Sequence, residues 1–235
     1  MDLKGNKVIW LGHGTWLWET SEGKRLLVDL FLANNPKCPP EYHDPGQLDG
    51  ILITHGHIDH LADAVSTLTA RPDTPAYAIL EVAGFLNAKG CANVTGFNKG
   101  GTVEVAGVKA TMVNAVHSSS VLDGDQIVVG GDPAGYIMEF PDGLVVYHAG
   151  DTDVFSDMAL YREIYAPTVA VLPIGDFFTM GPRQAAHAVR LLGVSGVLCG
   201  HYGTFPPLVG RPNQVRELVG AGVDIPDTEP GVTLP

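Results

Sequence analysis

Four side chains that can bind a metal ion lie within six residues of this chain, in the segment His55-Gly56-His57-Ile58-Asp59-His60. The segment follows the apolar run 50–54, which predicts a buried strand, and precedes the run 61–70, which has the apolar spacing of a helix. Imidazole and carboxylate groups are the usual ligands of zinc and iron, and three crowded histidines would repel one another once protonated. The pattern predicts a metal-binding loop. The alternative is a polar loop in which Asp59 caps the helix.

Three further donors each follow a strand-like run. His117 follows the run 108–116, Asp151 follows the run 144–148 after two small residues, and His201 follows the run 197–200. Taken singly, each is an ordinary residue for the end of a strand. Together with the first segment, they provide enough donors for two metal sites.

The rest of the chain alternates strand-like and helical runs. Strands are expected at 8–11, 15–20, 25–31, 50–54, 77–80, 94–95, 102–105, 108–116, 136–140, 144–148, 169–174 and 197–200. Helices are expected at 61–70, about 81–88, 182–192 and 214–219, with a loop at 33–49 and an extended tail at 226–235. No Ser- or Pro-rich linker or charge block divides the chain. The sequence therefore predicts one α+β domain over 1–235, with two sheets face to face and helices outside.

Composition narrows the class of partner. With 26 acidic and 14 basic residues, the net charge is −12, which argues against nucleic acid as a partner and favours a small molecule. Three widely spaced cysteines without a CxxC pair fit a reducing compartment. The N-terminus lacks a signal-peptide pattern, and no run reaches the ~18 apolar residues of a membrane span. We expect a cytoplasmic protein that does not enter a membrane, and a homo-oligomer is compatible with the sequence.

The order HxHxDH, His, Asp, His resembles the metallo-β-lactamase superfamily. Flanking segments resemble one branch of it, the UPF0173 type of metal-dependent hydrolase, related to ascorbate-6-phosphate lactonases and N-acyl-phosphatidylethanolamine phospholipases. These segments are Trp10-Leu11-Gly12-His13, Gly100-Gly101-Thr102-Val103, Ala115-Val116-His117-Ser118-Ser119, His148-Ala149-Gly150-Asp151-Thr152, Phe178-Thr179-Met180-Gly181-Pro182 and His201-Tyr202-Gly203-Thr204-Phe205. One departure is Leu30, where the branch usually has proline after the aspartate equivalent to Asp29.

The resemblance implies a four-layer αβ/βα sandwich of two mixed sheets, with two divalent metal ions. The first ion would be held by His55, His57 and His117, and the second by Asp59, His60 and His201, with Asp151 bridging both. Zinc is the default for such donors, although Mn²⁺ or Fe²⁺ would fit them too. A bridging water, acidified by the ions, would be the nucleophile. By the same resemblance, the catalytic residue Asp59 would orient this water and carry a proton to the leaving group.

Three more residues are expected near the ligands. Asp29 and His13 are placed behind them, where an acceptor can fix a ligand's tautomer, although His13 could equally be a turn residue. Tyr202 either donates a hydrogen bond to a developing oxyanion or only packs at a strand end.

The leading functional prediction is a hydrolase of a small molecule. The sequence does not choose among an ester, a lactone, an amide and a phosphodiester, because all four react with the same activated water. A diiron redox protein of the same fold and a non-catalytic metal-binding scaffold are the alternatives. The redox members resemble fusions to a flavin domain, and no such domain is present here.

Overall fold

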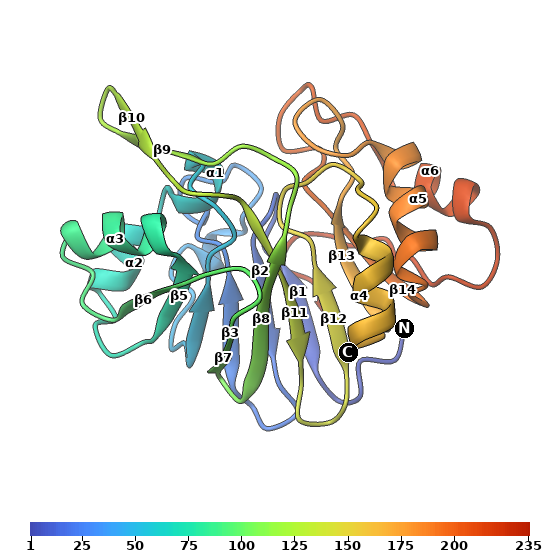
Figure 1. Cartoon of the computed structure of the whole chain (residues 1–235), viewed down its shortest axis with the longest axis horizontal. Coiled ribbons are helices and arrows are strands. Elements are labelled where there is room, and N and C mark those ends of the chain that lie inside the picture. The colour runs from blue at the N-terminus through green and yellow to red at the C-terminus, as the bar shows by residue number, and fades with distance from the viewer.

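The computed structural model describes residues 1–235, in which two mixed β-sheets pack face to face between two layers of helices (Figure 1). The first sheet has the order β15 (Thr233–Leu234), β1 (Lys7–Trp10), β2 (Trp16–Glu19), β3 (Arg25–Val28), β4 (Gly50–Leu52), β5 (Ala76–Ile79), β6 (Val94–Phe97). The second has the order β14 (Gly196–Gly200), β13 (Val169–Pro173), β12 (Val145–His148), β11 (Ala134–Glu139), β8 (Val108–Asn114), β7 (Thr102–Val105). This arrangement confirms the predicted fold class.

Strand direction explains why the predicted ligands meet. In the first sheet, β2 is antiparallel to both β1 and β3, and β4 is parallel to β3, so β1, β3 and β4 run the same way. In the second sheet, β11 is antiparallel to both β8 and β12, and β14 follows β12 through parallel pairings. The carboxyl ends of strands that run the same way fall at one edge of their sheet. The loops after these six strands, together with a short helix that follows β4, carry all the predicted site residues.

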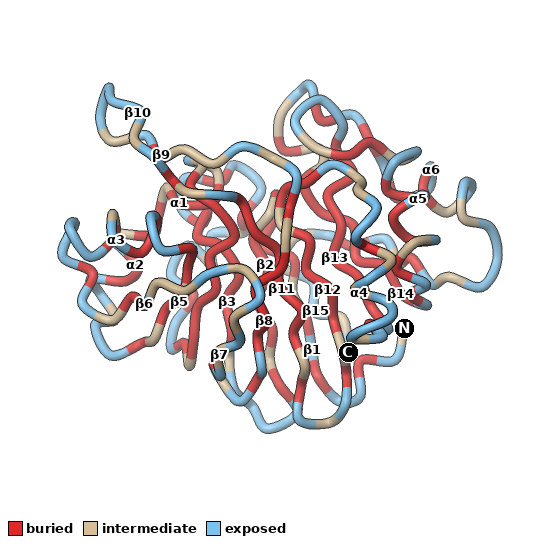
Figure 2. The backbone as a smooth tube through the Cα atoms, viewed as in Figure 1, coloured by how far each residue is buried: buried red, intermediate tan, exposed pale blue.

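Alternating side chains of the second sheet build two apolar cores. Tyr136 and Val146 face the first sheet in a core of 42 buried residues, while their neighbours Ile137 and Tyr147 belong to a core of 19 residues with the helices outside. This alternation follows from the two-residue period of a strand. Figure 2 shows the strands buried along most of their length, with exposed segments mainly in helices and turns.

Helices cover the outer face of each sheet (Figure 1). Those beside the first sheet are α1 (Ile58–Leu61), α2 (Ala64–Thr69) and α3 (Leu80–Ala88), and those beside the second are α4 (Met158–Tyr165), α5 (Pro182–Leu192) and α6 (Pro212–Val219). A 3₁₀ turn at Pro40–Tyr42 lies in the expected loop. None of these helices has the length and apolar character needed to cross a membrane.

Four segments differ from the sequence prediction. The single helix expected at 61–70 is wrong, because α1 begins earlier and a break separates it from α2. At this break the carboxylate of Asp63 accepts the backbone N–H of Leu32 at 2.6 Å and of Asn34 at 3.2 Å. A projecting hairpin, β9 (Ser120–Asp123) and β10 (Gln126–Val129), and helix α4 were not predicted. The tail at 226–235 contains β15, which pairs with β1.

Candidate metal centre

The carboxylate of Asp151 lies at the centre of the predicted ligands. Its Oδ2 atom is within 4 Å of four imidazole nitrogens, which come from three segments of the chain. The Nε2 atoms concerned are those of His201 at 3.0 Å, His60 at 3.4 Å, His117 at 3.7 Å and His55 at 3.9 Å. Because these residues follow strands of both sheets, the cluster spans the two halves of the sandwich.

The first predicted ligand set forms one compact group. The donor atoms of His55, His57 and His117 all lie within 4.8 Å of one another. Nε2 of His55 is 3.0 Å from Nδ1 of His57. His55 is fully enclosed, whereas His57 and His117 are partly exposed. This half of the cluster is therefore open toward solvent on one side.

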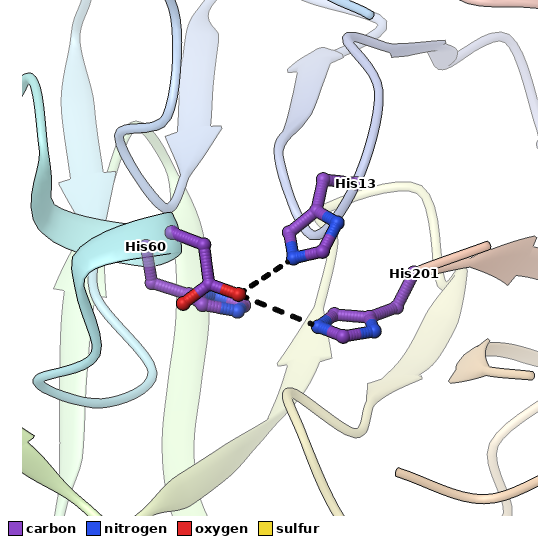
Figure 3. Close-up of side chains that lie close together, drawn as sticks. His13, His60 and His201 are labelled. Atoms are coloured by element: carbon purple, nitrogen blue, oxygen red, sulfur yellow. Dashed lines mark hydrogen bonds and ion pairs between the residues drawn. The ribbon is translucent and has the colours of Figure 1, made fainter. Parts of the chain in front are cut away.

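The second predicted set forms another group, and His13 joins it. The donor atoms of His13, Asp59, His60 and His201 lie within 4.8 Å of one another. Oδ2 of Asp59 is 2.8 Å from Nε2 of His13 and 3.8 Å from Nε2 of His201, and dashed lines mark these contacts in Figure 3. The sequence placed His13 behind the ligands, but the structure brings its ring nitrogen among the donor atoms.

The backbone turns three of these residues inward at strand ends. His13, Asp29 and His201 have φ values of 55°, 62° and 56°, in the left-handed region that costs a non-glycine residue about 1–3 kcal/mol. The backbone N–H of His201 donates to the carbonyl of His13 at 2.9 Å, so the two strained loops hold each other. Strain of this kind persists where surrounding structure enforces it, often at functional sites.

Asp29 lies directly behind His60. Its carboxylate accepts Nδ1–H of His60 at 2.7 Å, the backbone N–H of Thr54 at 2.8 Å and the hydroxyl of Thr54 at 2.7 Å. A carboxylate on one ring nitrogen fixes the tautomer and leaves the other nitrogen free for a metal ion. Nε2 of His60 therefore faces the cluster, where a bound metal ion would replace the proton on this nitrogen.

Neighbouring charges and burial shift the pKa values of the clustered side chains in opposite directions. Burial alone would raise the pKa of Asp151, but attraction to His201 and His60 outweighs it and holds the pKa well below the usual range. Burial opposes the charged form of His60, yet Asp151 and Asp29 raise its pKa well above 6.5. Burial, followed by repulsion from His60, lowers the pKa of His55 well below 6.5. Asp151 is consequently an anion at neutral pH, which suits a group that must face cations.

Unpaired buried nitrogens test whether the residues fit a metal. Nε2 of His60, both ring nitrogens of His201 and Nδ1 of His13 are buried without a hydrogen-bond partner. Folded proteins satisfy the large majority of such atoms. Nε2 of His60 and Nε2 of His201 converge on the carboxylate of Asp151 at 3.4 and 3.0 Å without hydrogen-bond geometry, as the ligands of a cation would. The donor set therefore fits metal binding.

The remaining histidines and Tyr202 lie outside this cluster. The hydroxyl of Tyr202 donates to the carbonyl of Thr228 at 3.2 Å, and its ring stacks on Trp10 with centroids 4.9 Å apart, so its contacts are those of packing. Buried His148 accepts the N–H of Gly150 at 3.4 Å. Exposed His43 and His187 take no part in the site.

A cleft of about 1020 Å³ opens above the donors. Apart from site residues, its lining includes four phenylalanines, which sequence reasoning did not identify as cleft residues. Isolated phenylalanines usually indicate core. Phe178 and Phe205 lie within flanking segments that resemble the UPF0173 type, but neither was predicted to line a cleft.

A four-layer sandwich that gathers histidines and aspartates from six loops at one edge defines a metallohydrolase of the β-lactamase superfamily. A family described as the beta-lactamase superfamily domain matches residues 18–202.

Within that superfamily, the chain belongs to the UPF0173 metal-dependent hydrolases. It is 43% identical to the member from Koribacter versatilis over 233 residues, 99% of each chain. It is 48% identical to the member from Herpetosiphon aurantiacus over 217 residues, 91% of this chain and 90% of the relative. The solved structure of Igni18, a metallo hydrolase from the archaeon Ignicoccus hospitalis, is 33% identical with a TM-score of 0.84, covering 97% of each chain. These relatives confirm the predicted family and the prediction that the protein is a metal-dependent hydrolase.

Proposed function

We propose that the protein binds two divalent metal ions, zinc by default, and hydrolyses a small-molecule ester, lactone, amide or phosphodiester. The observation that carries the proposal is Oδ2 of Asp151, within 4 Å of imidazole nitrogens from both ligand sets. One carboxylate that faces both sets is what a bridge between two ions requires. Mn²⁺ or Fe²⁺ would accept the same donors.

The ligands are assigned as two sets with a shared bridge. His55, His57 and His117 would hold one ion, Asp59, His60 and His201 the other, and Asp151 both. Bound there, the ions would lower the pKa of a shared water toward neutrality and supply a hydroxide nucleophile. The net charge of −12 supports a small molecule over nucleic acid as substrate.

Asp59 would act on protons beside the nucleophile. Although burial raises its pKa, the hydrogen bond with His13 and attraction to His60 hold the pKa below 3.8. Asp59 is therefore an anion at neutral pH. Its carboxylate lines the cleft, where it could take a proton from the nucleophile and pass it to the leaving group.

The test is metal content and turnover in matched variants. Elemental analysis of the purified protein should give close to two ions per chain, and a panel of ester, lactone, amide and phosphodiester substrates should identify an activity. Asp151→Asn keeps the size of the residue but removes the bridging charge, so turnover should fall at least about 100-fold, with metal loss. His43→Ala and His187→Ala, both exposed, should retain full turnover. Two bound ions and full turnover in Asp151→Asn would overturn the proposal.

A further inference from the structure

Phenylalanine dominates the cleft above the metal donors. Four of the eight phenylalanines in the chain line it, namely Phe31, Phe177, Phe178 and Phe205. At about 1020 Å³ the cleft is large enough for a small molecule with an apolar group of several carbons. Such a concentration of rings beside a polar metal centre points to an apolar part of the substrate.

The cleft offers no fixed positive charge outside the metal centre. No lysine or arginine lines it, and its only basic side chains are His57 and His117, which belong to the first ligand set. The chain as a whole carries a net charge of −12. A substrate with a carboxylate or phosphate remote from the reacting bond would therefore lose hydration in the cleft without gaining a positively charged partner.

The loop between β13 and α5 holds two of the rings at the mouth of the cleft. Phe177 is 70% exposed and Phe178 is 53% exposed, and their centroids lie 4.7 Å apart at nearly a right angle. Asp176 and Phe177 have φ values of 68° and 64°. Two consecutive left-handed residues are costly, so the backbone is held in this shape by the fold.

Hydrogen bonds fix that loop to the metal centre. The N–H of Asp176 donates to the carbonyl of Met180 at 3.0 Å, and the N–H of Met180 donates to the carbonyl of Thr152 at 3.2 Å. Thr152 directly follows the central carboxylate of Asp151. Exposed rings on an anchored loop beside the site form a preformed apolar wall rather than a mobile surface.

A second apolar groove adjoins the opposite wall. Ile58, which is 56% exposed, lines both the cleft and a groove of about 420 Å³ beside the hairpin β9–β10. That groove is lined further by Val65, Phe85 and Val121. Its one basic side chain, Lys89, is paired with Asp123 at 2.7 Å. Apolar surface thus continues away from the metal centre.

We infer that the substrate carries an aromatic ring or alkyl chain that packs on Phe177 and Phe178, and no charged group away from the reacting bond. This inference rests on the proposed function and narrows it to substrates with an apolar tail. With a carbonyl substrate, the oxygen of water bonds to the carbonyl carbon and the bond to the leaving oxygen or nitrogen breaks. The leaving group receives a proton, and the products are a carboxylic acid and an alcohol or amine.

Hydroxamic acids, which chelate zinc and carry a variable tail, test the inference through binding alone. Calorimetric titration of zinc-loaded protein should give phenylacetohydroxamic acid at least about tenfold tighter binding than acetohydroxamic acid, because the ring leaves water. Butyrohydroxamic acid should bind at least about tenfold more tightly than succinic monohydroxamic acid, which has a tail of the same length ending in a carboxylate.

Variants locate the effect. The double variant Phe177→Ser, Phe178→Ser should lose most of the preference for the phenyl tail while acetohydroxamic acid binds as before. Ile164→Ser, at a residue 66% exposed on α4 and outside the cleft, should keep the preference. Equal affinities for the phenyl and methyl tails, or for the neutral and anionic tails, would overturn the inference. If no hydroxamic acid bound, the proposed function would fall, and the inference with it.

Discussion

Asp29 shows at the scale of one residue how the site depends on a group that touches no metal. Its three accepted hydrogen bonds use both carboxylate oxygens and tie His60 to the strand end at Thr54. The left-handed backbone at Asp29 turns the chain so that the carboxylate reaches behind the ligand. The carboxylate therefore sets both the orientation and the basicity of His60.

Replacing Asp29 should weaken metal binding without unfolding the chain. Asp29→Asn keeps the shape but removes the charge that strengthens the ligand, so affinity for the ion held by His60 should fall about 10- to 100-fold. Competition with a fluorescent chelator measures this. Asp142→Asn is the matched control, because Asp142 accepts bonds from Asn6 and Ser21 at the opposite edge of the sheet. Equal affinities in the two variants would contradict the assignment.

Buried His148 is expected to make the folded state less stable as the pH falls. Burial lowers its pKa from 6.5 to about 4, so as the pH falls the unfolded chain takes up this proton first. The contribution of neutral His148 to the free energy of unfolding is complete above pH 6.5. As the pH falls from 6.5 to 4 this contribution is lost, by about 1.4 kcal/mol per pH unit at most. Urea unfolding of metal-depleted protein at pH 7, 6 and 5 measures the free energy of unfolding. This free energy should fall less steeply with pH in His148→Gln than in the parent protein. Parallel declines in variant and parent would contradict this origin.

At the scale of elements, the patterns that were predictable are those set by local sequence. The buried strand before His55 and the helix 182–192 follow from apolar periodicity and from proline at the first helical position. The break at Asp63 does not, because it depends on backbone donors of Leu32 and Asn34, distant in sequence. Helix α4 was not predicted because it buries only Met158 fully, while its half-buried Tyr161 and Tyr165 pack on the second core.

The candidate site also has features that local sequence predicts and features that it does not. The sequence predicted that the histidines and aspartates of the site follow strands, and the structure confirms those positions, because each of them comes after an apolar run that forms a strand. The position of His13 among the donors was not predicted, because it requires the two sheets to meet. The wall formed by Phe177 and Phe178 could not be predicted either. It depends on a loop with left-handed backbone conformation, which a hydrogen bond to the carbonyl of Thr152 holds in place.

The C-terminal tail is expected to stabilise the first sheet. Besides the pairing of β15 with β1, the N–H of Gly231 donates to the carbonyl of Trp10 at 2.8 Å, and Thr228 accepts the hydroxyl of Tyr202. Removing residues 226–235 breaks these bonds and should lower the free energy of unfolding by about 2 kcal/mol. Tyr202→Phe, which loses one bond, should lower it by about 1 kcal/mol. Chemical denaturation that gave the parent stability for the truncated chain would show the tail to be unattached.

At the scale of the whole molecule, the metal centre lies where the two sheets meet at one edge. Direct bonds already cross there, from the hydroxyl of Tyr136 to the carbonyl of Ile53 at 2.6 Å and from the N–H of Ala134 to the carbonyl of Thr54 at 3.0 Å. The fold should therefore persist without metal. Ions held by His55 and Asp59 on one side and by His117 and His201 on the other would add cross-links between the halves.

Metal removal should consequently lower the melting temperature rather than abolish the fold. A ligand that binds only the folded state stabilises it by about 2.7 kcal/mol at a free concentration 100 times its Kd. Calorimetric scans of zinc-loaded and chelator-treated protein at pH 7 should differ by several degrees, with far-ultraviolet circular dichroism unchanged below the transition. Asp151→Asn, which lacks the bridging charge, should show a smaller difference. Identical melting temperatures for the loaded and stripped parent would mean that the ions do not join the two halves.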